Sequence, residues 1–139
     1  MIKKKILNPG RIRSINGGFN FIPHRFLTDG FLDSLIQIEI LLYFFLILAS
    51  NRNGLSFYSY DAICSLLGLS ADDYIEARDG LMEKNLIAFD GTIFQVLDLP
   101  SKPVEAAATK LSHNSDRRQY CYQIKRLIQQ SLWEAQDGQ

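Results

Sequence analysis

The stretch that decides the fold is LSADDYIEARDGLMEKNLIAFDGTIF, residues 69–94. Apolar residues in its first half recur at helical spacing and predict one buried stripe. The stripe consists of Tyr74, Ala77, Leu81 and Met82. Ser70 is a good N-cap, and Asp73 stands three residues later, as in a capping box. The stretch therefore predicts a helix that begins after Ser70 and ends near Asn85.

After this helix the pattern changes from helical to alternating. LIAFDGTIFQVL, residues 86–97, consists of two β-prone runs on either side of Asp90 and Gly91. Both turn residues tolerate positive φ, which makes Asp-Gly a strong signal for a tight hairpin. The sequence therefore predicts a β-hairpin directly after the helix that begins at Ser70.

Upstream, residues 35–50 read LIQIEILLYFFLILAS and are apolar on nearly every side. The uninterrupted apolar part, residues 40–49, is about half the length that a bilayer requires. This pattern favours the central helix of a folded core over a membrane span. We expect the helix to begin near Asp33 or Ser34 and to end at about Asn51.

Two further elements are predicted between this apolar helix and the helix that begins after Ser70. Residues 55–57 suit a short strand, and a second helix is predicted from Ser59 to Gly68. Ile63, Leu66 and Leu67 fall on one face of that helix.

The flanks divide the remaining chain. Residues 1–18 form a basic arm with few apolar anchors, and the folded domain is expected at 19–100. Within it, Phe19 to Leu27 suits an edge strand or an extended segment laid on the core. We expect a linker at 101–114 and an amphipathic helix at 115–135.

The order of helix, short strand, helix, three-residue turn, helix and hairpin resembles a winged helix-turn-helix domain. YDAICSLLGLSADDYIEARDGLMEKNLIAF, residues 60–89, carries the resemblance. It implies a mainly α fold with a small β-hairpin wing, to which the C-terminal amphipathic helix is added. The chain, including GGFNFIPHRFLTDGFLDSL at 17–35, is also similar to small winged-helix proteins encoded beside bacterial insertion-sequence transposases.

Charge is distributed unevenly along a chain whose formal net charge is zero. Residues 1–28 contain six cations and no acid, whereas residues 69–99 contain seven acids and two cations. In the DNA-binding members of the family that the chain resembles, the outward face of the helix before the hairpin is usually basic. In this chain the outward positions of that helix are expected to be acidic, and they are Asp72, Asp73, Glu76 and Asp79. We call it the acidic helix.

Two functions fit this pattern. In the first, the protein is a DNA-binding accessory or regulatory protein of transcription, replication or transposition, which contacts double-stranded DNA through basic terminal segments and adjacent aromatics. The candidate DNA-binding residues are Lys3, Lys4, Lys5, Arg11, Arg13, Arg25, Arg52, Tyr58, Tyr60, Arg117 and Arg118. In the second, the four outward acids dock a basic protein partner, which in a homotypic version is the arm of another copy.

The C-terminal helix predicts a homodimer, because family members that the chain resembles often pair through such an added helix. Its apolar stripe comprises Tyr120, Ile124, Leu127, Ile128 and Leu132. The same stripe would also suit packing against its own domain.

Catalytic signatures are not evident in the sequence. His24 and His113 lack neighbours at metal-ligand spacing, and NGGFNF at 16–21 lacks the features of a phosphate-binding loop. We therefore expect a non-enzyme without metal or cofactor. The two cysteines and the absence of a signal-peptide pattern favour a cytoplasmic protein with free thiols.

Overall fold

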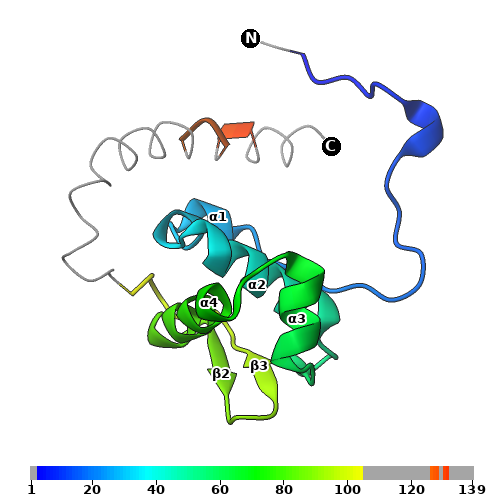
Figure 1. The fold of residues 1–139 in the computed structure, drawn as a ribbon. Coiled ribbons are helices and arrows are strands. Elements are labelled where there is room, and N and C mark those ends of the chain that lie inside the picture. The colour runs from blue at the N-terminus through cyan, green and yellow to red at the C-terminus, as the bar shows by residue number, and fades with distance from the viewer. Residues whose placement is uncertain (1–2, 105–125, 129, 132–139) are drawn as a thin grey trace.

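The computed structural model describes residues 3–104, 126–128 and 130–131. This part of the chain is mainly helical, with one small three-stranded antiparallel sheet (Figure 1). Its α-helices are α1 Arg25–Thr28, α2 Gln37–Ala49, α3 Tyr60–Leu67 and α4 Ala71–Glu83. The strands are β1 Leu55–Ser56, β2 Ile87–Phe89 and β3 Phe94–Val96, and 3-10 turns lie at Pro9–Arg11 and Leu32–Ser34. Residues 126–128 and 130–131 are also helical.

Helix α2 lies at the centre of the fold and packs against α4. Leu42 and Leu46 are fully buried on α2, as its near-continuous apolar sequence requires. The helix begins later than predicted, because residues 32–34 form a 3-10 turn and the Glu39 side chain accepts a hydrogen bond from the Ile36 N–H. Among the described residues, none of the helices combines the length and the apolar sequence that a membrane span requires.

Helices α3 and α4 have the local signals that the sequence predicts. The Ser59 and Ser70 side chains cap α3 and α4, respectively, and Gly68 ends α3 in a left-handed conformation. Asn85 stops α4 with a φ of 58°, a region that Asn tolerates better than most residues.

Two apolar residues on these helices are more exposed than predicted. Leu66 is 69% exposed and Met82 is 36% exposed. Ile63 and Leu81, by contrast, are fully buried. Predicting Met82 as part of the buried stripe was therefore wrong, and Leu66, expected on one face with Ile63, does not share the burial of that residue.

The sheet has the order β1-β3-β2, with both pairs antiparallel. Ala88 lies opposite Gln95 in the β2–β3 pair, and Leu55 lies opposite the same Gln95 in the β1–β3 pair. The predicted hairpin is confirmed, but its turn is not the tight type. Of the loop residues between β2 and β3, only Gly91 has a positive φ. The Asp90 carboxylate accepts hydrogen bonds from Thr92 N and Ile93 N.

The segment before α2 forms no strand, contrary to the edge-strand alternative for Phe19 to Leu27. Asn20 donates hydrogen bonds to the carbonyls of Leu48 and Ser50, which ties this segment to the end of α2. Pro23 then leads into the short helix α1, and Phe26 is buried. Side chain bonds, rather than sheet pairing, thus hold this segment.

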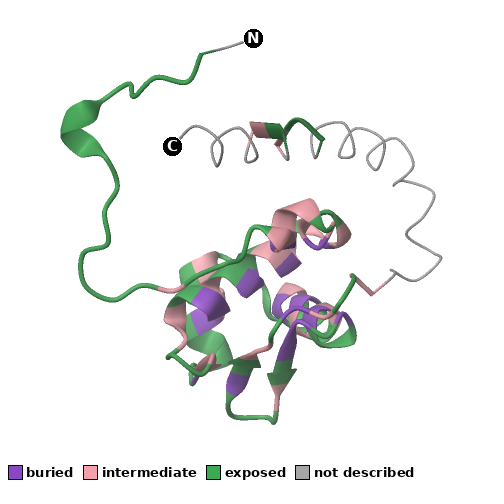
Figure 2. Ribbon diagram, turned by 180° about the vertical axis from the view of Figure 1, so that it is seen from behind, coloured by how far each residue is buried: buried purple, intermediate pink, exposed green. Residues whose placement is uncertain are grey.

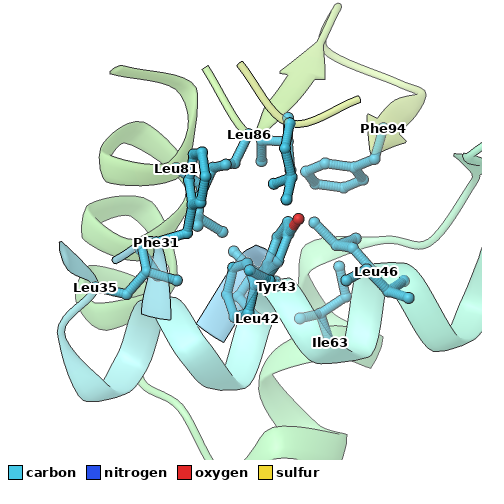
Figure 3. Close-up of a cluster of buried hydrophobic side chains, with 14 of the residues drawn as sticks. Phe31, Leu35, Leu42, Tyr43, Leu46, Ile63, Leu81, Leu86 and Phe94 are labelled. Carbon is cyan, nitrogen blue, oxygen red and sulfur yellow. The ribbon is translucent and has the colours of Figure 1, made fainter. Parts of the chain in front are cut away.

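One apolar core joins α1, the three longer helices and the sheet (Figure 3). Its largest fully buried hydrophobic side chains are Phe31, Phe94, Leu35, Leu42, Leu46, Ile63, Leu81 and Leu86. Buried positions gather where the helices face one another and the sheet, whereas the arm is exposed along its described length (Figure 2). The core therefore fixes the direction in which each face of α4 points.

Candidate nucleic-acid interface

The basic arm is the most cationic part of the described chain. Residues 3–18 are all exposed, and the arm runs outside the packed helices (Figure 1). Its cations are Lys3, Lys4, Lys5, Arg11 and Arg13. No ion pair joins any of them to an acid within the described residues. Their charge is therefore available to a polyanion.

One arm lysine has a protein partner. Lys4 Nζ donates to the Ser131 carbonyl over 3.2 Å and also to the Ser131 hydroxyl. The structure thus brings the arm and the C-terminal helical residues together at this point. A polyanion that took Lys4 would replace two neutral acceptors by an anion, which adds the attraction between opposite charges.

Arg25 differs from the arm cations because its guanidinium is engaged in the fold. It donates to the Pro100 carbonyl over 2.6 Å and to the Leu99 carbonyl over 3.3 Å. It also pairs with Asp29 and lies over the Phe31 ring. These contacts fasten the chain after β3 to α1, and we attribute Arg25 to the fold.

The other candidates within residues 19–100 lie on two separate surfaces. Arg52 is exposed in the turn before β1, beside a cavity of about 200 Å³. Tyr58 packs edge-on against Phe45, with ring centres 5.4 Å apart, and Tyr60 lies 6.4 Å from the ring of Tyr74. The structure therefore does not gather Arg52 and the tyrosines into one cluster with the arm.

The outward face of α4 is acidic, as predicted. Asp72, Glu76 and Asp79 are exposed, and Asp73 is half-buried. Asp73 N donates to the Ser70 hydroxyl over 3.0 Å, which supplies one half of the predicted capping box. Acids in this first turn also suit the positive end of the helix dipole. Glu76 and Asp79 lie beyond that turn, so the cap does not explain them.

Arg78 is the only cation within α4, and it lies between two rings. Its guanidinium is 5.6 Å from the Tyr74 ring centre and 5.4 Å from that of Phe89. It also pairs with Asp79 over 3.1 Å. Burial raises the pKa of the Tyr74 hydroxyl, while Arg78 acts in the opposite direction. Arg78 is thus held against the protein, and of the outward acids it is paired with Asp79 alone.

The same residues border a groove of about 580 Å³ between the start of α3, α4 and the hairpin. We call it the aromatic groove; its lining is Phe57, Tyr58, Ser59, Tyr60, Tyr74, Arg78, Phe89, Gly91 and Thr92. Sequence reasoning found Tyr58 and Tyr60 but missed Phe57 and Arg78. The run FYSY at 57–60, three aromatics around one serine, was the available signal.

The remaining candidates fall mostly outside the described residues. These are Arg117, Arg118, Tyr120, Ile124 and Leu132. Two members of the predicted dimer stripe are described: Leu127 is 67% exposed and Ile128 is half-buried. Leu127 therefore has most of its surface available for a partner.

Sequence reasoning also missed the pairing of Glu39 with Lys84. Lys84 follows the last residue of α4, is only 7% exposed and pairs with Glu39, which is 1% exposed. A lone acid at the start of an apolar helix was the available signal, because a buried carboxylate requires a partner.

Comparisons of the chain with protein families, curated proteins and solved structures give no match. Within the described residues, no three His, Cys, Asp or Glu side chains are grouped so that they could hold a metal ion.

Proposed function

We propose that residues 37–96 form a winged helix-turn-helix domain and that the protein binds duplex DNA, chiefly through its basic terminal segments. The succession α2, β1, α3, α4, β2 and β3 supports this assignment, as does the sheet order β1-β3-β2. The short connection between α3 and α4, residues 68–70, is of the length that a helix-turn-helix uses.

The observation that carries the proposal is the exposure of five arm cations on a segment without acids. Duplex DNA binds such a segment through phosphate contacts, which release counterions and carry no sequence information. An extended basic arm can also enter a minor groove. Arg117 and Arg118 would extend this contact from the other end of the chain.

The acidic face of α4 determines how DNA is seated. Asp72, Glu76 and Asp79 would meet phosphates if α4 entered a groove, and each would lose the counterion release that a cation provides. An acid can accept a hydrogen bond from cytosine, but three in one helix exceed that use. DNA is therefore held away from the middle of α4.

The resemblance to proteins encoded beside insertion-sequence transposases suggests a biological process in which the DNA binding takes part. An accessory role in transposition, transcription control or replication requires a DNA contact that positions other proteins. Binding dominated by phosphate contacts suits such a role, because it is strong without demanding one sequence.

Fluorescence anisotropy with a labelled duplex tests the proposal. At low salt we expect micromolar or tighter binding that weakens steeply as salt rises. Replacing Lys3, Lys4 and Lys5 by Ala should weaken binding to all sequences alike, whereas Lys102→Ala, an exposed lysine outside the arm, should have a smaller effect. Absence of binding at low salt would eliminate the proposal.

A second candidate, a protein-interaction module, is favoured by the mixed character of the α4 face. Ile75 is 44% exposed and Met82 36% exposed on the helix that carries the outward acids. An apolar centre with a charged surround is the usual composition of a docking surface. Glu76→Lys combined with Asp79→Lys should then abolish a partner complex, whereas Asp98→Lys, an exposed acid outside α4, should retain it.

We also propose that the C-terminal helix pairs two copies, for which the exposure of Leu127 is the support. Leu127→Glu should lower the sedimentation coefficient toward that of a monomer. An unchanged coefficient would place any dimer contact elsewhere.

A further inference from the structure

Three aromatic residues that line the aromatic groove are exposed. Phe57 is 69% exposed, Tyr58 43% and Tyr60 54%. Phe89, Gly91 and Thr92 of the hairpin line the groove together with these rings. Adjacent exposed apolar surface of this kind marks an interaction site.

The charges around the groove restrict what it can bind. Asp61, Asp79 and Asp90 adjoin lining residues in the sequence, and all three are exposed. Hydrogen bonds from Ile93 N and, to a smaller extent, Thr92 N hold the pKa of Asp90 below its usual value. The only cation in the lining, Arg78, is already paired with Asp79. Aromatic walls and an acidic rim attract a cationic segment that carries an apolar anchor and disfavour phosphates.

The arm contains a segment of this composition. Ile12 lies between Arg11 and Arg13, and its backbone is extended, with φ of −68° and ψ of 133°. Arg11 ends the 3-10 turn and Arg13 follows Ile12, and both arginines have long side chains that can carry their charged ends to the rim while Ile12 is inserted. Ile12 is 61% exposed, which leaves its apolar surface without a partner.

We propose that the aromatic groove of one copy receives Arg11-Ile12-Arg13 from the arm of a second copy. Ile12 contacts the rings of Phe57 and Tyr60, and the two arginines pair with acids of the rim. A second copy is the occupant because the arm runs outside its own domain, with Ile12 exposed (Figures 1 and 2).

This contact does not rest on the proposed DNA binding, since no nucleic acid takes part in it. The two would nevertheless compete, because both use Arg11 and Arg13. DNA should therefore release the arm from the groove.

Disulfide cross-linking of the full chain, without nucleic acid, tests the proposal. In a background of Cys64→Ser and Cys121→Ser, one chain carries Ile12→Cys and a second carries Thr92→Cys in the groove. The matched control replaces the second chain by Ser65→Cys, which is exposed on α3 but does not line the groove. Circular dichroism confirms that each variant is folded.

We expect the Ile12→Cys chain to couple to Thr92→Cys about five to ten times faster than to Ser65→Cys, and high salt should remove most of this preference. In chains with the native cysteines, Arg11→Glu with Arg13→Glu should weaken salt-sensitive self-association, and Asp61→Arg with Asp79→Arg on the other chain should restore it upon mixing. Equal coupling to both cysteines overturns the proposal. Two further samples separate the other occupants. A chain that carries both Ile12→Cys and Thr92→Cys is oxidised alone, and coupling confined to this chain overturns the proposal in favour of the chain's own arm. An oligonucleotide is added to the Thr92→Cys chain, and its protection of this cysteine, without arm coupling, overturns the proposal in favour of nucleic acid.

Discussion

Glu39 and Lys84 form a buried ion pair that joins the start of α2 to the end of α4, with 2.5 Å between Oε1 and Nζ. Lys84 Nζ also donates to the Ser34 carbonyl over 2.9 Å, and Glu39 Oε1 also accepts from Ile36 N. The pair thus couples the cap of one helix to the last turn of the other. This connection helps to hold α4 with Tyr74 and Leu81 inward and its acids outward.

Removing one member of this pair should destabilise the fold strongly. Lys84→Met leaves the Glu39 carboxylate buried without its counter-ion, and we expect a loss of about 3–5 kcal/mol in the free energy of unfolding. Urea denaturation followed by circular dichroism measures it. Lys102→Met, at an exposed site, should cost less than about 0.5 kcal/mol. Similar losses for the two variants would show that the pair is not a stabilising contact.

Gly80 makes room for the Glu39 carboxylate, because a Cβ at this position would lie 1.8 Å from Glu39 Oε2. Gly80→Ala should therefore destabilise the protein by about 1–3 kcal/mol through overpacking. Helix propensity alone predicts the opposite, a gain of about 1 kcal/mol. In a Glu39→Ala background, Gly80→Ala should be neutral or stabilising. A stability gain from Gly80→Ala in the native background would contradict this packing argument.

Arg25 should affect stability and not DNA binding. Arg25→Ala removes the bonds to the carbonyls of Leu99 and Pro100, at a cost of about 1–2 kcal/mol, reduced by the partial exposure of the side chain. Arg13→Ala, in the exposed arm, should show the converse: unchanged unfolding and weaker DNA binding. Chemical denaturation and anisotropy on both variants separate these roles. Arg25→Ala with native stability and weakened binding would return Arg25 to the interface.

Tyr43 should make stability fall at high pH. Burial raises its pKa from the usual 10.0 to about 12. The folded state therefore retains the phenol proton that the unfolded state has lost, and stability declines as pH rises from 10 to 12. We expect this group to account for about 2–3 kcal/mol of the decline. Unfolding curves of Tyr43→Phe should show a decline smaller by that amount, and parallel curves for the two proteins would contradict the assignment.

Local patterns in the sequence predicted the elements around α4 well. Helical spacing and the Ser70 cap identified α4, and the alternation around Asp90-Gly91 identified the hairpin. The turn type differed because the Asp90 side chain, and not a second positive φ, closes the loop. Periodicity also identified Tyr74 and Leu81 as buried, but it overestimated Met82 at the edge of the stripe.

Contacts between distant residues were beyond the reach of such patterns. Glu39 and Lys84 are 45 positions apart, and although Glu39 is a lone acid at the start of an apolar helix, no local pattern identifies Lys84 as its partner. Arg25 likewise reads as one cation among several, yet it binds carbonyls 74 and 75 positions away. The aromatic groove forms only when the start of α3 meets the hairpin. These features depend on how α2, α4 and the hairpin pack, which a single sequence does not specify locally.

The salt dependence of duplex binding tests the central claim most directly, that arm cations and not α4 hold DNA. In a plot of log Kobs against log salt concentration, replacing Lys3, Lys4 and Lys5 by Ala should reduce the slope by up to about 2.7, or about 0.9 for each lost phosphate contact. Asp72→Asn with Glu76→Gln should leave the slope unchanged. An unchanged slope in the arm variant, together with a large change in the α4 variant, would contradict the claim.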